Sequence, residues 1–371
     1  MKSFFIVILI SIFFISCKKE LKFFTPGEIW PDNNGVHINA HGGGLLFHKN
    51  VYYWYGEHKI EGDAGNRAMV GVHCYSSKNL YDWHDEGIVL SVEDDTTSLI
   101  VKGCIIERPK VIFNEKTGKF VMWFHHELKS MGYKAAKTGV AVADSPIGKF
   151  EYKGSVNPNA GEWPVNFSER QKAVAFPDTL KDWSDEWLKA VANGLFICRD
   201  FEKGQMARDM ALFVDDDGKA YHIHASEENL TLHISELNDK YTGFTGRYAA
   251  VMPAGHNEAP AIFKKDGKYY LITSGCTGWA PNAARSFVAD NILGPWTSLG
   301  NPCRGTIEQT EKTFGGQSTY AFENPEKPGS FVLMLDQWRP RNAIDGRYVW
   351  LPIEFEQDRP TIKWADKWSL N

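Results

Sequence analysis

The stretch HNEAPAIFKKDGKYYLITSGCTGW, residues 256–279, has the pattern of a single β-hairpin. Two runs rich in aromatic and β-branched residues, AIF and YYLIT, flank a polar turn that contains Asp266 and Gly267, a pair typical of tight hairpin turns. Pro260 has no N–H and therefore suits the start of a strand better than its middle. Glu258 directly precedes this start, so its carboxylate is predicted to lie at the rim of a sheet, where functional sites are often built.

The same pattern occurs five times along the chain. Four of the hairpins are followed by a second, weaker pair of strands. The starts of the five hairpins are separated by 65, 101, 49 and 58 residues. About 50 residues per four-stranded unit is typical of a β-propeller blade. The pattern therefore predicts an all-β fold, a five-bladed β-propeller, with a β-sandwich as the alternative. The five hairpins are GGLLFHKNVYYWYGE (43–57), RPKVIFNEKTGKFVMWFHHE (108–127), DMALFVDDDGKAYHIHASEE (209–228), EAPAIFKKDGKYYLITSG (258–275) and GQSTYAFENPEKPGSFVLMLDQW (316–338).

The long spacing between the second and third hairpins indicates an insertion at about 155–205. Within it, DTLKDWSDEWLKAVANGL (178–195) places its large apolar residues near helical spacing, which predicts a helix. No low-complexity linker divides the chain after residue 25, so residues 26–371 are predicted to form one catalytic domain. The sequence thus predicts a propeller with a partly helical insertion between blades 2 and 3.

The N-terminus has the layout of an export signal. Met1-Lys2 is followed by a short apolar run and then by Ile-Ser-Cys, which is too short to span a bilayer comfortably and resembles a bacterial lipoprotein signal. We predict a signal peptide over 1–17 with Cys17 as the lipidated residue and 18–25 as a short tether; an uncleaved signal anchor is the alternative. The protein is then an exported lipoprotein, periplasmic or at the outer membrane or cell surface, that meets the membrane only through its lipid.

The composition excludes some partners. A formal net charge of −5 argues against nucleic acid, which requires a basic face. The five remaining cysteines are scattered without a C-x-x-C motif, which argues against a zinc site. The Asp215–Gly218 run reads as a hairpin turn and not as a calcium loop, and the strand histidines His222 and His224 read as structural. We therefore predict no metal and no cofactor, and a monomer.

Inner strands of a propeller start at one end of a common axis, so residues at the five hairpin starts are predicted to meet. Three of the five starts carry a carboxylate, and crowding carboxylates in a water-poor funnel raises the pKa of at least one. Such a group donates a proton at neutral pH, as glycoside hydrolysis requires. The converging residues are His41, Glu57, Glu107, Asp209, Glu258 and Gln317.

With RDMALFVDDDGKAY in the third unit and NEAPAIFKKDGKYYL in the fourth, the chain resembles glycoside hydrolase family 43 over nearly all of its length after the signal. The resemblance implies that Glu258 is the general acid and that Asp209 tunes and orients it. It also implies inversion of configuration.

The family's usual aspartate base at the first blade is missing here, because the chain has INAHGGGLLF at that place. Loss of a general base costs about 10²–10⁴ in rate. The departure resembles one branch, the exo-β-1,3-galactanases, at AHGGG (40–44), YYWYGE (52–57), ERPKVIFN (107–114), EAPAIFK (258–264) and GGQSTY (315–320).

Resemblance to that branch implies that Gln317 takes the place of the base and positions water, with an imidic acid tautomer as one route, and that the substrate is an arabinogalactan-type galactan. The implied galactose-binding residues are Glu57, Glu107, Tyr133, His41, Glu228, Asn229 and Thr277. Two alternatives stay open: an α-L-arabinofuranosidase or β-xylosidase of the same family, and a sugar-binding lipoprotein without activity.

Overall fold

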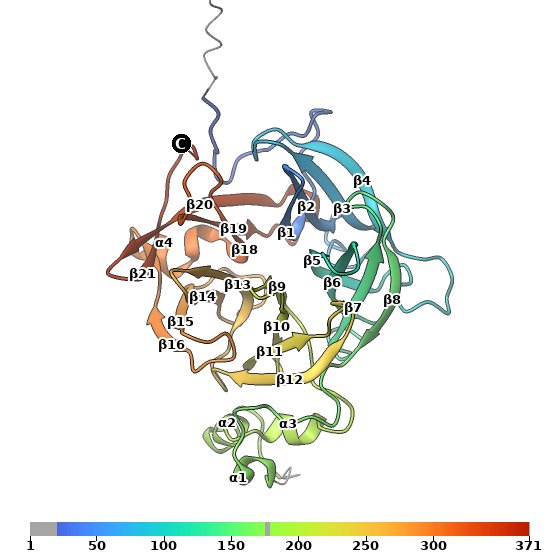
Figure 1. Cartoon of the computed structure of the whole chain (residues 1–371), viewed down its shortest axis with the longest axis vertical. Coiled ribbons are helices and arrows are strands. Elements are labelled where there is room, and N and C mark those ends of the chain that lie inside the picture. The colour runs from blue at the N-terminus through green and yellow to red at the C-terminus, as the bar shows by residue number, and fades with distance from the viewer. Residues whose placement is uncertain (1–20, 175–178, 371) are drawn as a thin grey trace, which may run out of the picture.

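The computed structural model describes residues 21–174 and 179–370, so the predicted signal and Cys17 lie outside the described residues. The strands form five sheets arranged around a central axis (Figure 1). Within each sheet, neighbouring strands in the order of the chain pair antiparallel, starting from the axis. The predicted five-bladed β-propeller is confirmed.

Blade 1 contains β1 (His41–His48), β2 (Val51–His58), β3 (Gly71–Ser77) and β4 (His84–Ser91). Blade 2 contains β5 (Ile105–Asn114), β6 (Lys119–Glu127), β7 (Lys137–Ala143) and β8 (Glu151–Val156). Blade 3 contains β9 (Met210–Val214), β10 (Ala220–Ser226), β11 (Thr231–Leu237) and β12 (Phe244–Val251). Blade 4 contains β13 (Glu258–Lys265), β14 (Lys268–Ser274), β15 (Arg285–Ala289) and β16 (Thr297–Gly300). Blade 5 contains β18 (Gln317–Glu323), β19 (Phe331–Gln337), β20 (Arg347–Glu356) and β21 (Arg359–Lys363), and the short β17 (Cys303–Arg304) pairs parallel to β21.

The hydrophobic core is divided among the junctions between blades. Each blade has two apolar faces and buries each of them against a neighbour. Large aromatic residues fill the junction of blades 5 and 1, where Trp54 and Trp350 are fully buried. Phe24 and Trp368 pair through backbone hydrogen bonds of 2.8 and 3.2 Å, so the two ends of the described chain close the ring at this junction.

Four of the inner strands carry a β-bulge at their start. In β1, β5 and β13 two residues oppose one on the partner strand, directly after His41, Glu107 and Glu258; β18 carries a similar shift after Ser318. The residue that follows the functional position has a positive φ in three cases, at Gly42, Arg108 and Ala259. A bulge bends the strand and re-aims side chains, so these starts turn toward the axis.

The insertion between blades 2 and 3 is helical, as predicted. It contains α1 (Glu169–Lys172), α2 (Asp185–Ala192) and α3 (Leu195–Asp200), which lie together outside the ring of blades (Figure 1). The main helix is shorter than the predicted range because Ser184 caps it, accepting a hydrogen bond from the Trp187 N–H. Gly194 (φ 95°) then separates α2 from α3. Blade 5 also contains the short helices α4 (Ile307–Glu311), η1 (Thr313–Gly315) and η2 (Ala343–Asp345).

Within the described part of the chain, no helix has the length and apolar character to cross a membrane. The five cysteines there are all free thiols: Cys74, Cys104, Cys198, Cys276 and Cys303.

Candidate active site

A pocket of about 350 Å³ opens on the axis at the end where the inner strands start. All five blades contribute to it. Seven predicted site residues line this pocket: Glu57, Glu107, Tyr133, Asp209, Asn229, Glu258 and Gln317. The structure therefore brings together most of the residues singled out from the sequence, although they are spread over 261 positions of the chain.

Glu258 and Asp209 form the acidic side of the pocket. Burial and the nearby Asp209 carboxylate raise the pKa of Glu258 to about 7, and the charge of Arg108 and a hydrogen bond from Asn229 oppose this rise. Asn229 Nδ2 donates to Glu258 Oε1 at 2.6 Å. Asp209 Oδ2 lies 3.1 Å from Arg108 Nη2. The pKa of Glu258 thus lies near neutral pH, while Asp209 is paired with a cation. This difference suits Glu258 to donate a proton and Asp209 to act as a stabilising charge.

Gln317 also lines the pocket and is held at both ends of its amide. Arg108 Nη2 donates to its Oε1, and its Nε2 donates to Ser274 Oγ at 2.7 Å. Arg108 is therefore shared between Gln317 and Asp209. The guanidinium is buried and also donates to the Ser318 carbonyl at 2.9 Å. Arg108 fixes the orientation of the Gln317 amide, because a guanidinium only donates and a flipped amide would turn its NH₂ group toward this donor.

The third side of the pocket holds Glu107, Tyr133 and His125. Tyr133 OH donates to Glu107 Oε1 at 2.7 Å, and His125 Nδ1 lies 3.0 Å from Glu107 Oε2. Burial disfavours the charged form of Glu107, but His125, Lys59 and Tyr133 outweigh it and lower its pKa to about 2. Burial likewise opposes a charge on His125, while Glu107 and Glu127 raise its pKa to about 9. Glu107 is an anion at neutral pH.

Glu57 is buried, and burial raises its pKa, although Lys59 at 2.5 Å from Oε2 opposes the rise. Its Oε1 accepts from the Arg108 N–H at 2.9 Å. Gly42 has φ 58°, and a Cβ at that position would lie 2.2 Å from Glu57 Oε1. The Glu57 carboxylate thus occupies the space that a side chain at the start of β1 would require.

Three predicted residues lie outside the pocket lining. His41 is buried and stacks on Trp338, a pocket residue, with ring centroids 5.3 Å apart. Glu228 pairs with Arg208 at 3.0 Å. Thr277 Oγ1 donates to the Ala280 carbonyl at 2.6 Å, within its own loop. These side chains support neighbours of the pocket, and their predicted contact with galactose stays a prediction.

Sequence reasoning missed several lining residues. Some of them lie next to predicted site residues in the sequence, and this proximity could have indicated them. Arg108 follows Glu107, Arg208 precedes Asp209, and Trp279 follows Thr277 by two residues. Trp279 is 45% exposed and its ring lies 5.6 Å from that of Trp338, and exposed aromatic faces suit sugar C–H groups. The missed lining residues are Asn66, Arg108, His125, Arg208, Gly278, Trp279 and Trp338.

Asp336 is a further buried carboxylate beside the site. It pairs in register with Gln317, and its Oδ2 accepts from the Gly42 N–H. Burial raises its pKa to about 7, against the charge of Arg108. It was not anticipated, because nothing in FVLMLDQW separates a buried carboxylate from an exposed one.

One group in the described residues has the geometry to hold a cation: ligand atoms of Glu107, His125 and Asp209 lie within 4.8 Å of one another. Its acids already have cationic partners, since His125 contacts Glu107 and Arg108 contacts Asp209. We therefore interpret the group as an ion-pair network of the pocket.

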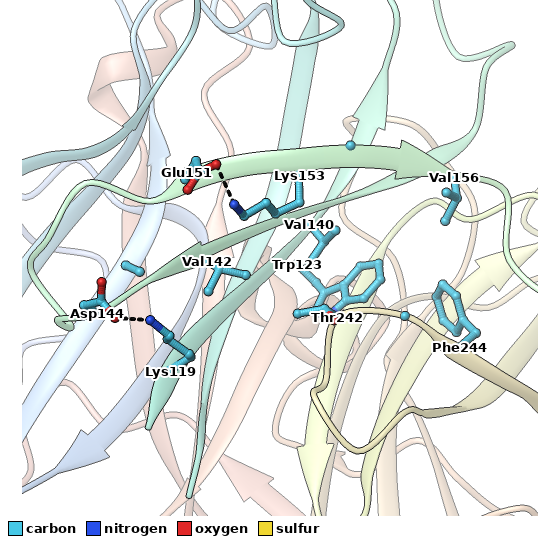
Figure 2. Close-up of a pocket in the computed structure, with 13 residues that line it drawn as sticks. Lys119, Trp123, Val140, Val142, Asp144, Glu151, Lys153, Val156, Thr242 and Phe244 are labelled. Carbon is cyan, nitrogen blue, oxygen red and sulfur yellow. Dashed lines mark hydrogen bonds and ion pairs between the residues drawn. The ribbon is translucent and has the colours of Figure 1, made fainter. Parts of the chain in front are cut away.

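A larger groove of about 660 Å³ lies between β6, β7 and β8 of blade 2 and the start of β12 in blade 3 (Figure 2). Its charged residues pair with each other, Lys119 with Asp144 and Lys153 with Glu151. The rest of its wall is mainly apolar and includes Val142 and Phe244. Because it holds no unpaired acid or base, the axial pocket is the better candidate.

The axial pocket combines a carboxyl group of raised pKa with a second carboxylate paired to a cation, an arrangement that suits a glycosidase. Comparison with known proteins gives the same class. The family model described as glycosyl hydrolases family 43 matches residues 181–346. A solved family 43 β-1,3-galactosidase, bound to galactodeoxynojirimycin, is 52% identical, with 93% of this chain and 100% of that chain covered and a TM-score of 0.90.

Two solved exo-β-1,3-galactanases are also similar. The enzyme from Phanerochaete chrysosporium, with β-1,3-galactotriose, is 31% identical over 94% of this chain and 69% of its own, at a TM-score of 0.75. The enzyme from Clostridium thermocellum is 33% identical over 93% and 66%, also at 0.75. A curated β-D-galactofuranosidase from Aspergillus niger is 31% identical over 127 residues, and this match spans 36% of its length. The chain belongs to glycoside hydrolase family 43, and the resemblance to its exo-β-1,3-galactanase branch is confirmed.

Proposed function

We propose that the protein is an exo-acting β-1,3-galactosidase that removes galactose from the β-1,3-linked backbone of arabinogalactan-type galactans. The observation that carries the mechanism is the state of Glu258, which lines the pocket with a pKa raised to about 7 and a fixed hydrogen bond from Asn229. The ligands in similar solved structures, galactodeoxynojirimycin and β-1,3-galactotriose, support the substrate class.

In the proposed reaction, Glu258 donates its proton to the oxygen that joins the terminal galactose to the rest of the chain. Water attacks the anomeric carbon from the opposite side, the glycosidic bond breaks and the configuration inverts. Burial and the negative charge of the nearby Asp209 favour the protonated form of Glu258 in the free enzyme. Arg108 pairs with Asp209, and its positive charge opposes part of the rise in the pKa of Glu258.

Gln317 takes the place of the general base in this proposal. An amide is a weak base, so we assign it the positioning of water, with its oxygen fixed by Arg108 and its nitrogen by Ser274. The anionic Glu107 and the buried Glu57 offer acceptors for galactose hydroxyls, together with Tyr133, while Trp279 offers an aromatic face. His41, Glu228, Asn229 and Thr277 complete the predicted binding set.

Product analysis tests the function. The purified protein is incubated with β-1,3-galactobiose, β-1,3-galactotriose and de-branched arabinogalactan, beside Glu258→Gln. Release of galactose by the wild type and its loss in the variant support the proposal. Turnover of arabinosides, xylosides or a β-D-galactofuranoside instead of these substrates overturns the substrate, and retained binding without any turnover favours a sugar-binding protein.

We also propose that the protein is an exported lipoprotein anchored through Cys17, and that it acts as a monomer. The apolar run and the Ile-Ser-Cys ending support the first part. Metabolic labelling with a fatty acid is expected to mark the wild type and to fail in Cys17→Ala. A labelled Cys17→Ala variant contradicts the anchor.

A further inference from the structure

The turn between β10 and β11 has an unusual backbone. Glu227, Glu228 and Asn229 have φ values of 52°, 58° and 66°, so three successive residues other than glycine occupy the left-handed region. Each such residue costs about 1 kcal/mol or more, and the conformation persists only where surrounding contacts hold it. Asn229, the last of the three, donates to Glu258 at 2.6 Å.

The helical insertion packs against the chain directly after the turn. Leu230, directly after the turn, is 1% exposed and packs in a cluster with residues of α2 and α3. This cluster is separate from the cores at the blade junctions. Its other buried members are Trp187, Val191, Leu195 and Phe196.

Charged groups tie the same turn to the insertion and to the pocket. Glu228 Oε2 lies 3.0 Å from Arg208 Nη2, and its Oε1 lies 3.8 Å from Arg199 Nη1 on α3. The same Arg208 nitrogen donates to the Tyr133 carbonyl at 2.7 Å. Below the turn, the buried Glu227 lies 3.1 Å from His233 Nε2.

The segment that leads into Glu258 is held by the same parts. The His256 N–H donates to the Leu230 carbonyl at 3.1 Å. The ring of Trp183, just before α2, meets the His256 ring edge-on at 5.9 Å. The insertion thus contacts both the turn that carries Asn229 and the segment that precedes Glu258.

We propose that the helical insertion is a positioning element for the general acid: it holds the left-handed Glu227–Asn229 turn so that the Asn229 amide orients Glu258. This inference rests on the proposed role of Glu258. The insertion acts through Asn229 and does not touch the reacting atoms, so its loss is expected to change both turnover and the ionisation of the acid.

The direction of the ionisation change follows from the groups that face Glu258. Asp209 raises its pKa, while Arg108, the Asn229 amide and the Cys276 thiol lower it. A hydrogen bond to a carboxylate favours the charged form, so its loss raises the pKa of Glu258 further. The limb of the pH profile on which activity falls with rising pH then moves to higher pH, while the maximal rate drops because the acid is no longer oriented.

A double-mutant cycle tests the inference with Leu195→Val, Asn229→Ala and their combination, assayed on β-1,3-galactobiose. Each single variant is expected to lower kcat about tenfold, the equivalent of one hydrogen bond of about 1.4 kcal/mol, and to move the basic limb of the pH profile upward. The combined variant is expected to be no worse than Asn229→Ala.

The matched control is Leu351→Val, a fully buried leucine on β20 in the outer part of blade 5. It is expected to lower Tm without moving kcat or the pH profile. Additive losses in the cycle, or a Leu195→Val variant that behaves like the control, overturn the inference. Arg199→Met provides a second, milder change if Leu195→Val does not fold.

A readout without turnover separates this inference from the proposed function. The Glu258 carboxyl titration is followed by infrared difference against Glu258→Gln, and a higher pKa in Leu195→Val supports positioning by the insertion. Unchanged titration overturns it. Wild-type protein that leaves galactobiose intact overturns the proposed substrate instead.

Discussion

The two ends of the five inner strands differ in both backbone and chemistry. At their starts, bulges turn Glu107 and Glu258 toward a pocket crowded with buried charges. At their ends, pairing is regular and residues such as Phe113, Leu212 and Phe263 line an apolar hollow on the same axis. Along one strand, function is therefore placed where the pairing is irregular, and stability where it is regular.

This difference has a physical basis. Buried charges are tolerated only when paired or neutralised, and the starts meet this condition through Arg108, His125 and Lys59. The ends need no such network because apolar burial is favourable by itself. Changes at the starts are thus expected to alter rate and pH dependence, and changes at the ends to alter stability.

The largest effect is expected from Glu258→Gln, which keeps the shape but removes the proton. The amide cannot act as an acid, so kcat on β-1,3-galactobiose should fall by about 10³ or more, within the range of lost general acid catalysis. Glu323→Gln, the same change at the exposed far end of β18, should leave kcat unaltered. Equal losses in both variants contradict the comparison.

A cavity created at the apolar ends of the inner strands should lower stability without changing activity. Leu212→Ala removes a side chain that is 4% exposed and is expected to lower the free energy of unfolding by about 2–5 kcal/mol. Urea unfolding measures this loss. Below the unfolding transition, kcat and KM are expected to match the wild type, and a tenfold change in either would show that the two ends are coupled.

Gln317→Ala tests the side of the pocket where water is placed. We expect kcat to fall about 10²-fold, the low end of the range for acid–base groups, since the amide positions water but is a weak base. Azide, which needs no deprotonation, should restore turnover and give a galactosyl azide of inverted configuration. A variant with full activity would move the water-positioning role to another residue.

The smallest expected effect is a shift in pH dependence. Asp209 raises the pKa of Glu258, so Asp209→Asn lowers it. Because the acid must be protonated, activity is lost as pH rises through its pKa, and this limb should move from about pH 7 to lower pH by about one unit. A pH profile of kcat/KM at constant ionic strength measures this shift. If the limb stays at the same pH, the raised pKa of Glu258 is due to burial alone.

Much of the architecture was predictable because it depends on patterns of neighbouring residues in the sequence. Five hairpins with aromatic strands, four of them with a glycine in the turn, predict five blades, and a helical period predicts the insertion. Equivalent strand starts must meet on a propeller axis, which is why Glu107, Asp209 and Gln317 were found together although far apart in sequence. The remaining features depend on contacts between blades, and no local pattern reports those.

The sequence by itself thus determined the blades, the acids at their starts and the family. Only the tertiary structure decided which carboxyl stays neutral, because that depends on burial and on neighbours contributed by other blades. It placed Arg108 between Asp209 and Gln317, His125 against Glu107, and the insertion over the turn that carries Asn229. Ionisation depends on distance and solvent in three dimensions, and the order of residues along the chain contains neither.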